Sequence, residues 1–192
     1  MTEQTTRVKP RLQQKYEDQV IPAMMEKFGF KNKLQAPKIQ KVTINMGLGM
    51  GASDNKIIED AQKELALIVG QKPIVTKAKK AISNFKIREG SSVGCAVVLR
   101  RAHMYEFLDR LINVALPRIR DFRGVSNKSF DESGNYSLGL REHTVFPELE
   151  IDKVDKVKGM TVTVTFKNSD KEKSFEFLRL IDMPFIKNKK DS

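Results

Sequence analysis

Apolar side chains recur at four-residue spacing near the start of the chain: Leu12, Tyr16, Val20, Met24 and Phe28. This spacing places them along one face of an α-helix. Pro10 suits the first turn of such a helix, and Gly29 suits its end. Pro22 lacks a backbone N–H, so we expect it to kink or divide the helix.

The pattern changes to strict alternation in the segment 38–46. Val42, Ile44 and Met46 fall on one side of an extended chain, and the other side carries polar residues, namely Lys41, Thr43 and Asn45. Such alternation predicts a strand with one buried face and one polar face. A glycine-rich turn and a second amphipathic helix, ended by Gly70, follow this strand.

Further strands are predicted at 73–77, 93–100 and 160–166, and further helices at 102–116 and 174–181. A basic loop through about residue 90 separates the strands at 73–77 and 93–100.

The segment 118–159 gives the weakest pattern, with short strand-like pieces at 136–140 and 144–146 among Gly, Ser and Asn. We therefore predict an α+β fold with a mainly antiparallel sheet, helices packed on one face in a split β-α-β or RRM-like arrangement, and a long irregular loop region. A flexible extension at 1–9, one domain at 10–186 and a basic tail at 187–192 complete the organisation.

The composition narrows the possible environments and partners. The chain has 192 residues and a net charge of +11, with a sequence pI near 9.7. No apolar run approaches the roughly 18 residues of a membrane span, and the N-terminus has no apolar core of a secretory signal. Cys95 is the only cysteine, so an intramolecular disulfide is impossible. These features predict a cytoplasmic protein with a polyanionic partner, most often nucleic acid, and no membrane association.

Charge is unevenly distributed along the chain. Residues 72–88 carry six basic side chains and no acidic one, and three arginines lie close together at Arg118, Arg120 and Arg123. An acidic stretch lies at 142–155, although lysines dilute it. These runs indicate either an anion-binding side and a second docking side, or ordinary solvated surfaces.

Gly47-x-Gly49-x-x-Ala52 follows a strand and precedes a helix, as in the dinucleotide-binding turn. That site requires an acidic residue at the end of the next strand to bind the ribose, whereas Lys77 stands there. The later order of elements also departs from β-α-β-α. A dinucleotide-dependent oxidoreductase therefore remains only an alternative to a tight structural turn.

Other enzymatic chemistry has little support in the sequence. His103, His143 and Cys95 show no metal-ligand spacing, and the motifs of nucleophile elbows and phosphate-binding loops are absent. Cys95 falls in a predicted core strand, where an inert buried thiol is expected. We predict no enzyme activity, no metal and no cofactor.

The polar groups nevertheless suit RNA. We expect the polar face of the strand at 38–46 and the residues Gln71, Lys72 and Thr76 to lie on adjacent strands, where amides, hydroxyls and ammonium groups contact phosphates, 2′-hydroxyls and bases. Phe85 in the basic loop has two possible roles, stacking on a base or anchoring the loop to the core. The guanidinium groups of the arginine cluster suit phosphate, although Arg120 and Asp121 form a possible internal pair.

Several longer segments resemble the bacterial form of large-subunit ribosomal protein five, the carrier of 5S rRNA. The similar segments run in family order over roughly residues 10–185: Glu26-Lys-Phe-Gly-Phe, Val42-Thr-Ile-Asn-Met-Gly-Leu-Gly, Gly70-Gln-Lys-Pro-Ile-Val-Thr-Lys-Ala-Lys-Lys-Ala, Met104-Tyr-Glu-Phe-Leu-Asp-Arg-Leu, Leu116-Pro-Arg-Ile-Arg-Asp-Phe-Arg-Gly, Asn135-Tyr-Ser-Leu-Gly and Phe146-Pro-Glu. His143 departs from the glutamine expected in this family, at a position with no assigned role.

The resemblance implies a structural constituent of the large ribosomal subunit that attaches 5S rRNA in the central protuberance. It implies the following 5S rRNA-binding residues: Asn45, Met46, Gly47, Gln71, Lys72 and Thr76. It also implies a mobile loop that contacts transfer RNA in the peptidyl site, with the residues Lys77, Lys79, Lys80, Phe85, Lys86 and Arg88. Arg118, Arg120 and Arg123 are expected to contact RNA or a partner. The implied partners are 5S rRNA, 23S rRNA, P-site tRNA, ribosomal protein eighteen of the large subunit and ribosomal protein thirteen of the small subunit, with the inter-subunit bridge in the region 110–150.

Overall fold

A computed structural model of the chain describes residues 9–49, 55–85, 87–150 and 154–186. Its centre is a five-stranded sheet in the order β2-β3-β1-β5-β4, and each neighbouring pair is antiparallel. The strands are β1 (Lys38–Gly47), β2 (Ile74–Lys77), β3 (Ser92–Leu99), β4 (Tyr136–Leu140) and β5 (Met160–Lys167). This architecture confirms the predicted α+β fold.

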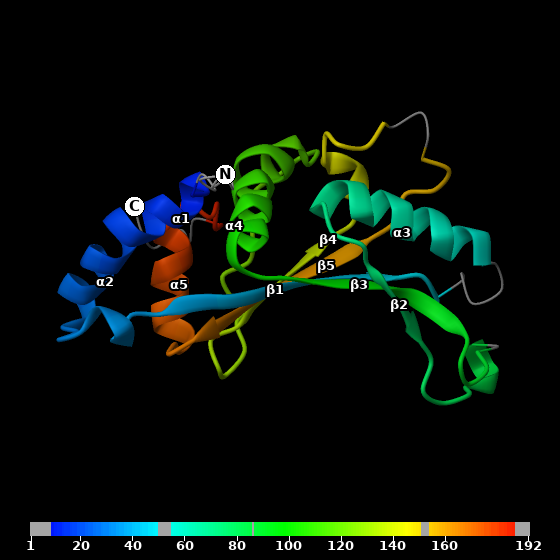
Figure 1. Cartoon of the computed structure of the whole chain (residues 1–192), viewed down its shortest axis with the longest axis horizontal. Coiled ribbons are helices and arrows are strands. Elements are labelled where there is room, and N and C mark those ends of the chain that lie inside the picture. The colour runs from blue at the N-terminus through cyan, green and yellow to red at the C-terminus, as the bar shows by residue number, and fades with distance from the viewer. Residues whose placement is uncertain (1–8, 50–54, 86, 151–153, 187–192) are drawn as a thin grey trace, which may run out of the picture.

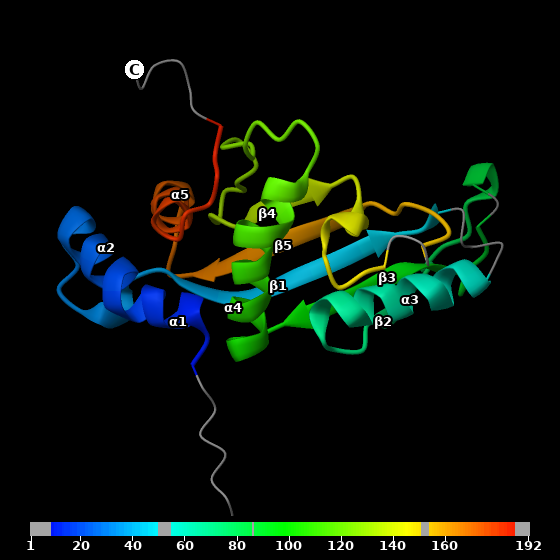
Figure 2. The same ribbon diagram turned by 90° about the horizontal axis from the view of Figure 1, so that it is seen from above.

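The described α-helices lie on one side of this sheet (Figure 1). Viewed from that side, α3 lies beside β2 and β3, α4 crosses the middle strands, and α1, α2 and α5 group at one end (Figure 2). Their bounds are α1 (Arg11–Lys15), α2 (Ile21–Phe28), α3 (Asn55–Val69), α4 (Arg101–Arg110) and α5 (Lys171–Leu180). The opposite side of the sheet carries none of the described α-helices, and we call it the open face.

The connection from β1 through α3 to β2 is a split β-α-β unit. Both β1 and β2 pair antiparallel with β3, so they run parallel to each other with β3 between them. The expectation that the polar residues of β1 and β2 lie on adjacent strands is therefore wrong. Strand β3 is hydrogen-bonded to β1 along one edge and to β2 along the other, so it separates the polar residues of β1 from those of β2.

This topology also excludes the dinucleotide-binding alternative. That fold requires adjacent parallel strands joined by a helix, with the phosphates bound at the turn between the first strand and the helix. Every neighbouring pair among the described strands is antiparallel. Of the proposed motif, Ala52 lies outside the described residues.

The first helix shows how proline is accommodated. A π-helical turn at Tyr16–Val20 separates α1 from α2, and Pro22 occupies the first turn of α2. The wider turn places the missing N–H of Pro22 where the regular ladder is already interrupted. Gly29 ends α2 with a φ of +65°, a left-handed conformation that favours glycine. The predicted division by Pro22 and the predicted end at Gly29 are confirmed.

The alternating strands meet this helical layer in the core. Val42, Ile44 and Met46 of β1 are fully buried. At the end near α5, the ring of Phe177 lies 5.2 Å from that of Phe166 on β5 and 5.4 Å from that of Tyr16. Burial of these apolar side chains is the main stabilising contribution to this layer.

The irregular region was predicted less well. The piece at 144–146 is a 3₁₀ turn at His143–Val145 and not a strand. Short 3₁₀ turns also occur at Lys33–Gln35, Ser83–Phe85 and Leu116–Arg118, and a second π-helical turn at Leu111–Ala115 extends α4.

A buried polar cluster attaches this irregular region to α3. Glu64 of α3 accepts two hydrogen bonds from Lys158 Nζ, at 2.6 and 2.8 Å, and lies 2.9 Å from His143 Nε2. The Lys158 backbone N–H donates to His143 Nδ1 at 3.2 Å, so the imidazole carries its proton on Nε2 and donates it to Glu64. Burial opposes ionisation of Glu64, but the hydrogen bonds from His143 and Lys158 outweigh it and lower the pKa of this carboxyl group.

Candidate nucleic-acid interface

Each strand contributes every second side chain to the open face, and on β1 and β5 these side chains are polar. Across its middle, Thr43 lies between Val98 of β3 and Thr163 of β5, and Ser137 of β4 follows Thr163. The next row runs through β2, β3, β1, β5 and β4 in the order Ile74, Ala96, Asn45, Thr161 and Gly139. Short hydroxyl and amide side chains therefore predominate on the β1, β5 and β4 part of this uncovered surface, whereas Ile74, Ala96 and Val98 make these rows apolar on β2 and β3.

Most of these groups are free to bind a ligand. Ser137 and Thr163 share a 3.1 Å hydrogen bond between their hydroxyls. Within the described part of the chain, the side chains of Lys41, Thr43 and Asn45 make no hydrogen bond or ion pair. Asn45 is exposed, so its amide can donate and accept hydrogen bonds at the surface.

Two glycines, on β1 and β3, lie opposite each other where β1 ends, and the two strands come close together there. Gly94 of β3 pairs with Gly47, and Thr76 of β2 pairs with Gly94 on the other side. A Cβ atom on Gly94 would lie 2.3 Å from the Met46 carbonyl oxygen and 3.2 Å from Thr76 Oγ1. Only glycine fits there, and the Met46 oxygen and the Thr76 hydroxyl border the same spot on the open face. We call this region, Gly47, Gly94 and Thr76, the glycine end.

Of the residues predicted to bind 5S rRNA, Gly47 and Thr76 belong to this end and Asn45 lies one row away, whereas Gln71 and Lys72 precede the start of β2 and lie away from it. Asn45 and Gly47 are exposed on β1, and Gln71 and Lys72 are exposed in the turn between α3 and β2. The Met46 side chain is fully buried, so any contact that it makes with RNA comes from its main chain.

The basic loop extends from the same end as a hairpin beyond the sheet (Figure 1). Ala78 N–H donates to Ser91 O at 2.8 Å, and Ile82 and Ile87 pair further out. Phe85 is 71% exposed at the tip, so the alternative in which it anchors the loop to the core is wrong. The lysines Lys77, Lys79 and Lys80 are exposed, as is Arg88, while Lys86 lies outside the described residues.

The arginine cluster lies beside the edge strand β4. Arg120 and Arg123 line a cleft of about 610 Å³ together with Ser137 and Gly139 of that strand. Arg118 is exposed next to a smaller hollow. Arg120 makes no ion pair with Asp121, so the proposed internal pair is absent between these two described residues.

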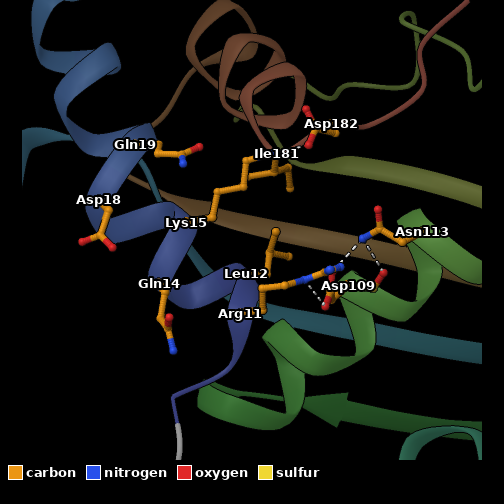
Figure 3. Close-up of a pocket in the computed structure, with 10 residues that line it drawn as sticks. All are labelled: Arg11, Leu12, Gln14, Lys15, Asp18, Gln19, Asp109, Asn113, Ile181 and Asp182. Atoms are coloured by element: carbon orange, nitrogen blue, oxygen red, sulfur yellow. Dashed lines mark hydrogen bonds and ion pairs between the residues drawn. The ribbon is translucent and has the colours of Figure 1, made fainter.

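A second hydrophilic cleft, of about 460 Å³, lies in the helical layer between α1, α4 and the end of α5 (Figure 3). Its charges pair with one another. Arg11 donates two hydrogen bonds to Asp109, at 2.7 and 3.2 Å, and Asn113 donates another to the same carboxylate. Lys15 pairs with Asp182 across the cleft. These internal pairs leave little charge for a ligand.

The described residues offer no support for a reactive cysteine, a metal site or a membrane-spanning helix. Cys95 is buried, and this burial raises the pKa of its thiol. Among the described residues, no group of three or more His, Cys, Asp or Glu side chains is placed to hold a metal ion. In the same part of the chain, none of the helices is long and apolar enough to span a membrane.

Comparison with known proteins identifies the family. Residues 32–88 match the family Ribosomal protein L5, and residues 92–185 match the model for the C-terminus of that ribosomal family. The large ribosomal subunit protein uL5 of Clostridium tetani (strain Massachusetts / E88) is 57% identical over 176 residues, which cover 92% of this chain and 98% of the relative. The uL5 of Clostridium kluyveri (strain NBRC 12016) is also 57% identical, with coverages of 91% and 97%.

The chain belongs to the ribosomal protein L5 family. As an L5-family protein it is a structural component of the large ribosomal subunit and not an enzyme, which confirms both expectations. Membership also confirms the resemblance noted from the sequence segments and places the protein in the ribosome.

Part of the open face of this L5-family protein was not predicted from the sequence. Thr161, Thr163 and Thr165 of β5, with Ser137 of β4, continue the polar surface beyond β1. Their signal was present in the alternation of Met160–Lys167, whose burial pattern follows the same period. Alternation marks two faces, but it does not show which strand lies beside β1.

Proposed function

We propose that this L5-family protein binds 5S rRNA on its open face and helps to attach it in the central protuberance. The observation that carries the proposal is a sheet surface, uncovered by the described helices, on which Thr43 and Asn45 are unpaired within the described part of the chain and Ser137 and Thr163 bond only to each other. Such groups match ribose 2′-hydroxyls and base edges, which distinguish a folded RNA from other polyanions.

The proposed binding residues extend from the glycine end along β2 to the turn that precedes it. Asn45, Gln71 and Thr76 supply amide and hydroxyl groups, and Lys72 supplies a charge for phosphate. Gly47 lets the RNA backbone approach the strand closely, and Met46 takes part through its main chain. In this division of roles, charge brings the RNA to the surface and the short polar groups select the 5S fold.

We infer a separate RNA contact for the β2–β3 hairpin. Its exposed lysines and Arg88 suit phosphates, and the exposed ring of Phe85 suits stacking on a base. By family resemblance, this loop contacts P-site tRNA.

The remaining partners are assigned to the region 110–150. The exposed arginines at its start suit 23S rRNA or a partner protein. By resemblance, this region bridges to ribosomal protein thirteen of the small subunit and adjoins ribosomal protein eighteen of the large subunit.

The proposal is tested by equilibrium binding to 5S rRNA and to an unrelated structured RNA of equal length, at two salt concentrations. Non-specific phosphate binding weakens steeply as salt rises, whereas base and 2′-hydroxyl contacts do not. We expect a preference for 5S rRNA of about a hundredfold that persists at the higher salt. Equal binding to both RNAs that disappears at the higher salt would overturn the proposal.

A further inference from the structure

The open face continues to a lysine-rich region at the start of β1, opposite the glycine end. Strand β1 begins at Lys38 near α2 and α5 and ends at the β2–β3 side of the molecule (Figure 1). Nine residue steps at about 3.3 Å place its two ends roughly 30 Å apart. A ligand that contacts both ends must therefore be long, as an RNA helix is.

Three segments bring lysines together at this distant end. Lys38 of β1 pairs directly with Lys167 of β5. Asn168 Nδ2 donates to the Leu34 carbonyl oxygen at 3.0 Å, which attaches the turn after β5 to the loop carrying Lys31 and Lys33. Helix α5 then begins at Lys171. We call these residues the lysine end: Lys31, Lys33, Lys38, Lys167 and Lys171.

This region keeps a net positive charge, because its lysines outnumber the acidic groups beside them. Residues 27–41 contain five lysines and no acidic residue. Among the neighbouring acidic groups, Asp170 pairs with Lys173, and Glu176 pairs with Lys27 and Arg179. The exposed side chain of Glu172, beside Lys171, has no partner among the described residues and offsets one of the five lysines. Glu17 acts on Lys38 electrostatically but is itself paired with Lys9.

The lysine end joins the open face along β5, beside a register shift in β1 between Ile39 and Lys41. Lys167 follows Thr165 and Thr163 on the same face of β5, and Lys41 of β1 lies opposite Thr165. The polar rows of the sheet therefore lead from the glycine end directly to the lysine end. This continuity favours one extended polyanion over a separate acidic protein segment.

We propose that the lysine end binds the phosphate backbone of the RNA helix held on the open face, independently of base sequence. This inference rests on the proposed function for the identity of the ligand as RNA. Flexible ammonium groups neutralise phosphates as point charges and do not read bases. The glycine end then selects the RNA, and the lysine end adds affinity and fixes its direction along β1.

The test compares two variants with the same change in net charge. The first carries Lys33→Gln, Lys167→Gln and Lys171→Gln at the lysine end. The matched control carries Lys56→Gln, Lys63→Gln and Lys156→Gln, which are exposed residues of α3 and of the loop before β5. Thermal melting by circular dichroism verifies that both variants fold, and binding is measured across a salt series with 5S rRNA and with an unrelated RNA hairpin.

We expect the lysine-end variant to bind both RNAs about tenfold or more weakly at 0.1 M salt, with a salt slope smaller in magnitude by about two to three. We expect the control variant to lose less than about threefold. Equal losses in the two variants would reduce the effect to net charge and overturn the inference. Unchanged binding in the lysine-end variant would also overturn it and would favour an acidic protein as the occupant.

The outcome separates this inference from the proposed function. If the wild-type protein shows no preference for 5S rRNA, the proposed function fails. The lysine end is still judged by comparing the two variants on the unrelated hairpin. If the preference for 5S rRNA stands but the two variants are equal, only the further inference fails.

Discussion

The helical layer and the open face are both rich in polar groups, but they use them differently. In the helical layer, charges satisfy one another, as Arg11 does with Asp109 and Lys158 with Glu64. On the open face, Thr43 and Asn45 have no such partner among the described residues. A polar group already bonded within the protein contributes to stability, and one left open is available to a ligand.

The number of charged residues in a region does not show how much charge is available to a ligand. The hydrophilic cleft in Figure 3 has several charged residues, yet internal pairs occupy most of them. The open face has few charges in its middle rows but many unused donors and acceptors. Substitutions in the helical layer should therefore change stability, and substitutions on the open face should change RNA binding.

The largest expected effect is on stability, at Glu64. The change Glu64→Gln keeps the size of the side chain but leaves the Lys158 ammonium, whose side chain is 6% exposed, without a counter-charge. We expect the free energy of unfolding in denaturant to fall by about 3 kcal/mol, because removing one partner of a buried pair leaves an uncompensated charge. The control Glu59→Gln alters an exposed carboxylate on the same helix and should cost less than about 0.5 kcal/mol. A loss of RNA affinity in the folded Glu64→Gln protein would contradict the assignment of the helical layer to stability alone.

The same pair should respond to acid. Because the folded-state pKa of Glu64 is lowered, its stabilisation is present above the unfolded pKa of about 4.3 and is lost as pH falls through the folded-state value. The stability difference between wild type and Glu64→Gln should therefore be full at neutral pH and shrink below about pH 4. Urea unfolding at a series of pH values measures it, and a difference that widens in acid would show that the sign is wrong.

A smaller loss is expected at the glycine end, where the two regions meet. Gly94→Ala places a methyl group 2.3 Å from the Met46 carbonyl oxygen, so the strands must shift. We expect the free energy of unfolding to fall by about 1–3 kcal/mol and 5S rRNA binding to weaken with it. Gly139→Ala is a matched control in the same sheet, since no described atom lies within 4 Å of its added Cβ. If both substitutions have the same effect, the close approach at Gly94 is unimportant.

Removal of one hydroxyl group on the open face should weaken RNA binding alone. Thr43→Val deletes a hydroxyl that bonds to no described residue, so we expect unchanged stability. The affinity for 5S rRNA should fall by about 0.5–1.5 kcal/mol, the value of one hydrogen bond. Isothermal titration measures the affinity, with Thr144→Val, in the His143–Val145 turn, as the control. Reduced stability without reduced affinity would assign Thr43 to the fold.

The smallest expected change concerns a single lysine of the β2–β3 hairpin. Lys79→Gln should lower the salt slope of RNA binding by about one unit in magnitude and affect all RNAs alike. Lys63→Gln on α3 provides the control, with no change in slope. A selective loss of one RNA in Lys79→Gln would instead indicate that this lysine contributes to recognition.

Much of the fold could be predicted from local patterns. Strand β4 has the predicted bounds, Tyr136–Leu140, and the four-residue apolar spacing correctly located the first helix. Strand order could not be predicted, because alternation in β1 and β2 contains no information about the strand between them. The turn at His143–Val145 looked like a strand because Val145 and Phe146 are apolar, but they are buried in an irregular segment attached to Glu64.

The types of polar residue in the candidate site could be predicted from the sequence, but the area of surface that they cover could not. The polar alternation of β1 correctly located Asn45 on an exposed face. The lysine end remained hidden because its members come from segments more than 120 residues apart, which only the pairing of β1 with β5 brings together. Long-range pairing of this kind depends on the whole fold and not on any short pattern.

The most direct test of RNA selection on the open face is the ratio of affinities for 5S rRNA and an unrelated RNA of equal length, measured at two salt concentrations in Asn45→Ala and Lys79→Gln. Asn45→Ala should lower this ratio and leave the salt slope unchanged, because the amide selects and carries no charge. Lys79→Gln should lower the slope and leave the ratio unchanged. An equal loss for both RNAs in Asn45→Ala, with the ratio preserved, would contradict selection by the open face.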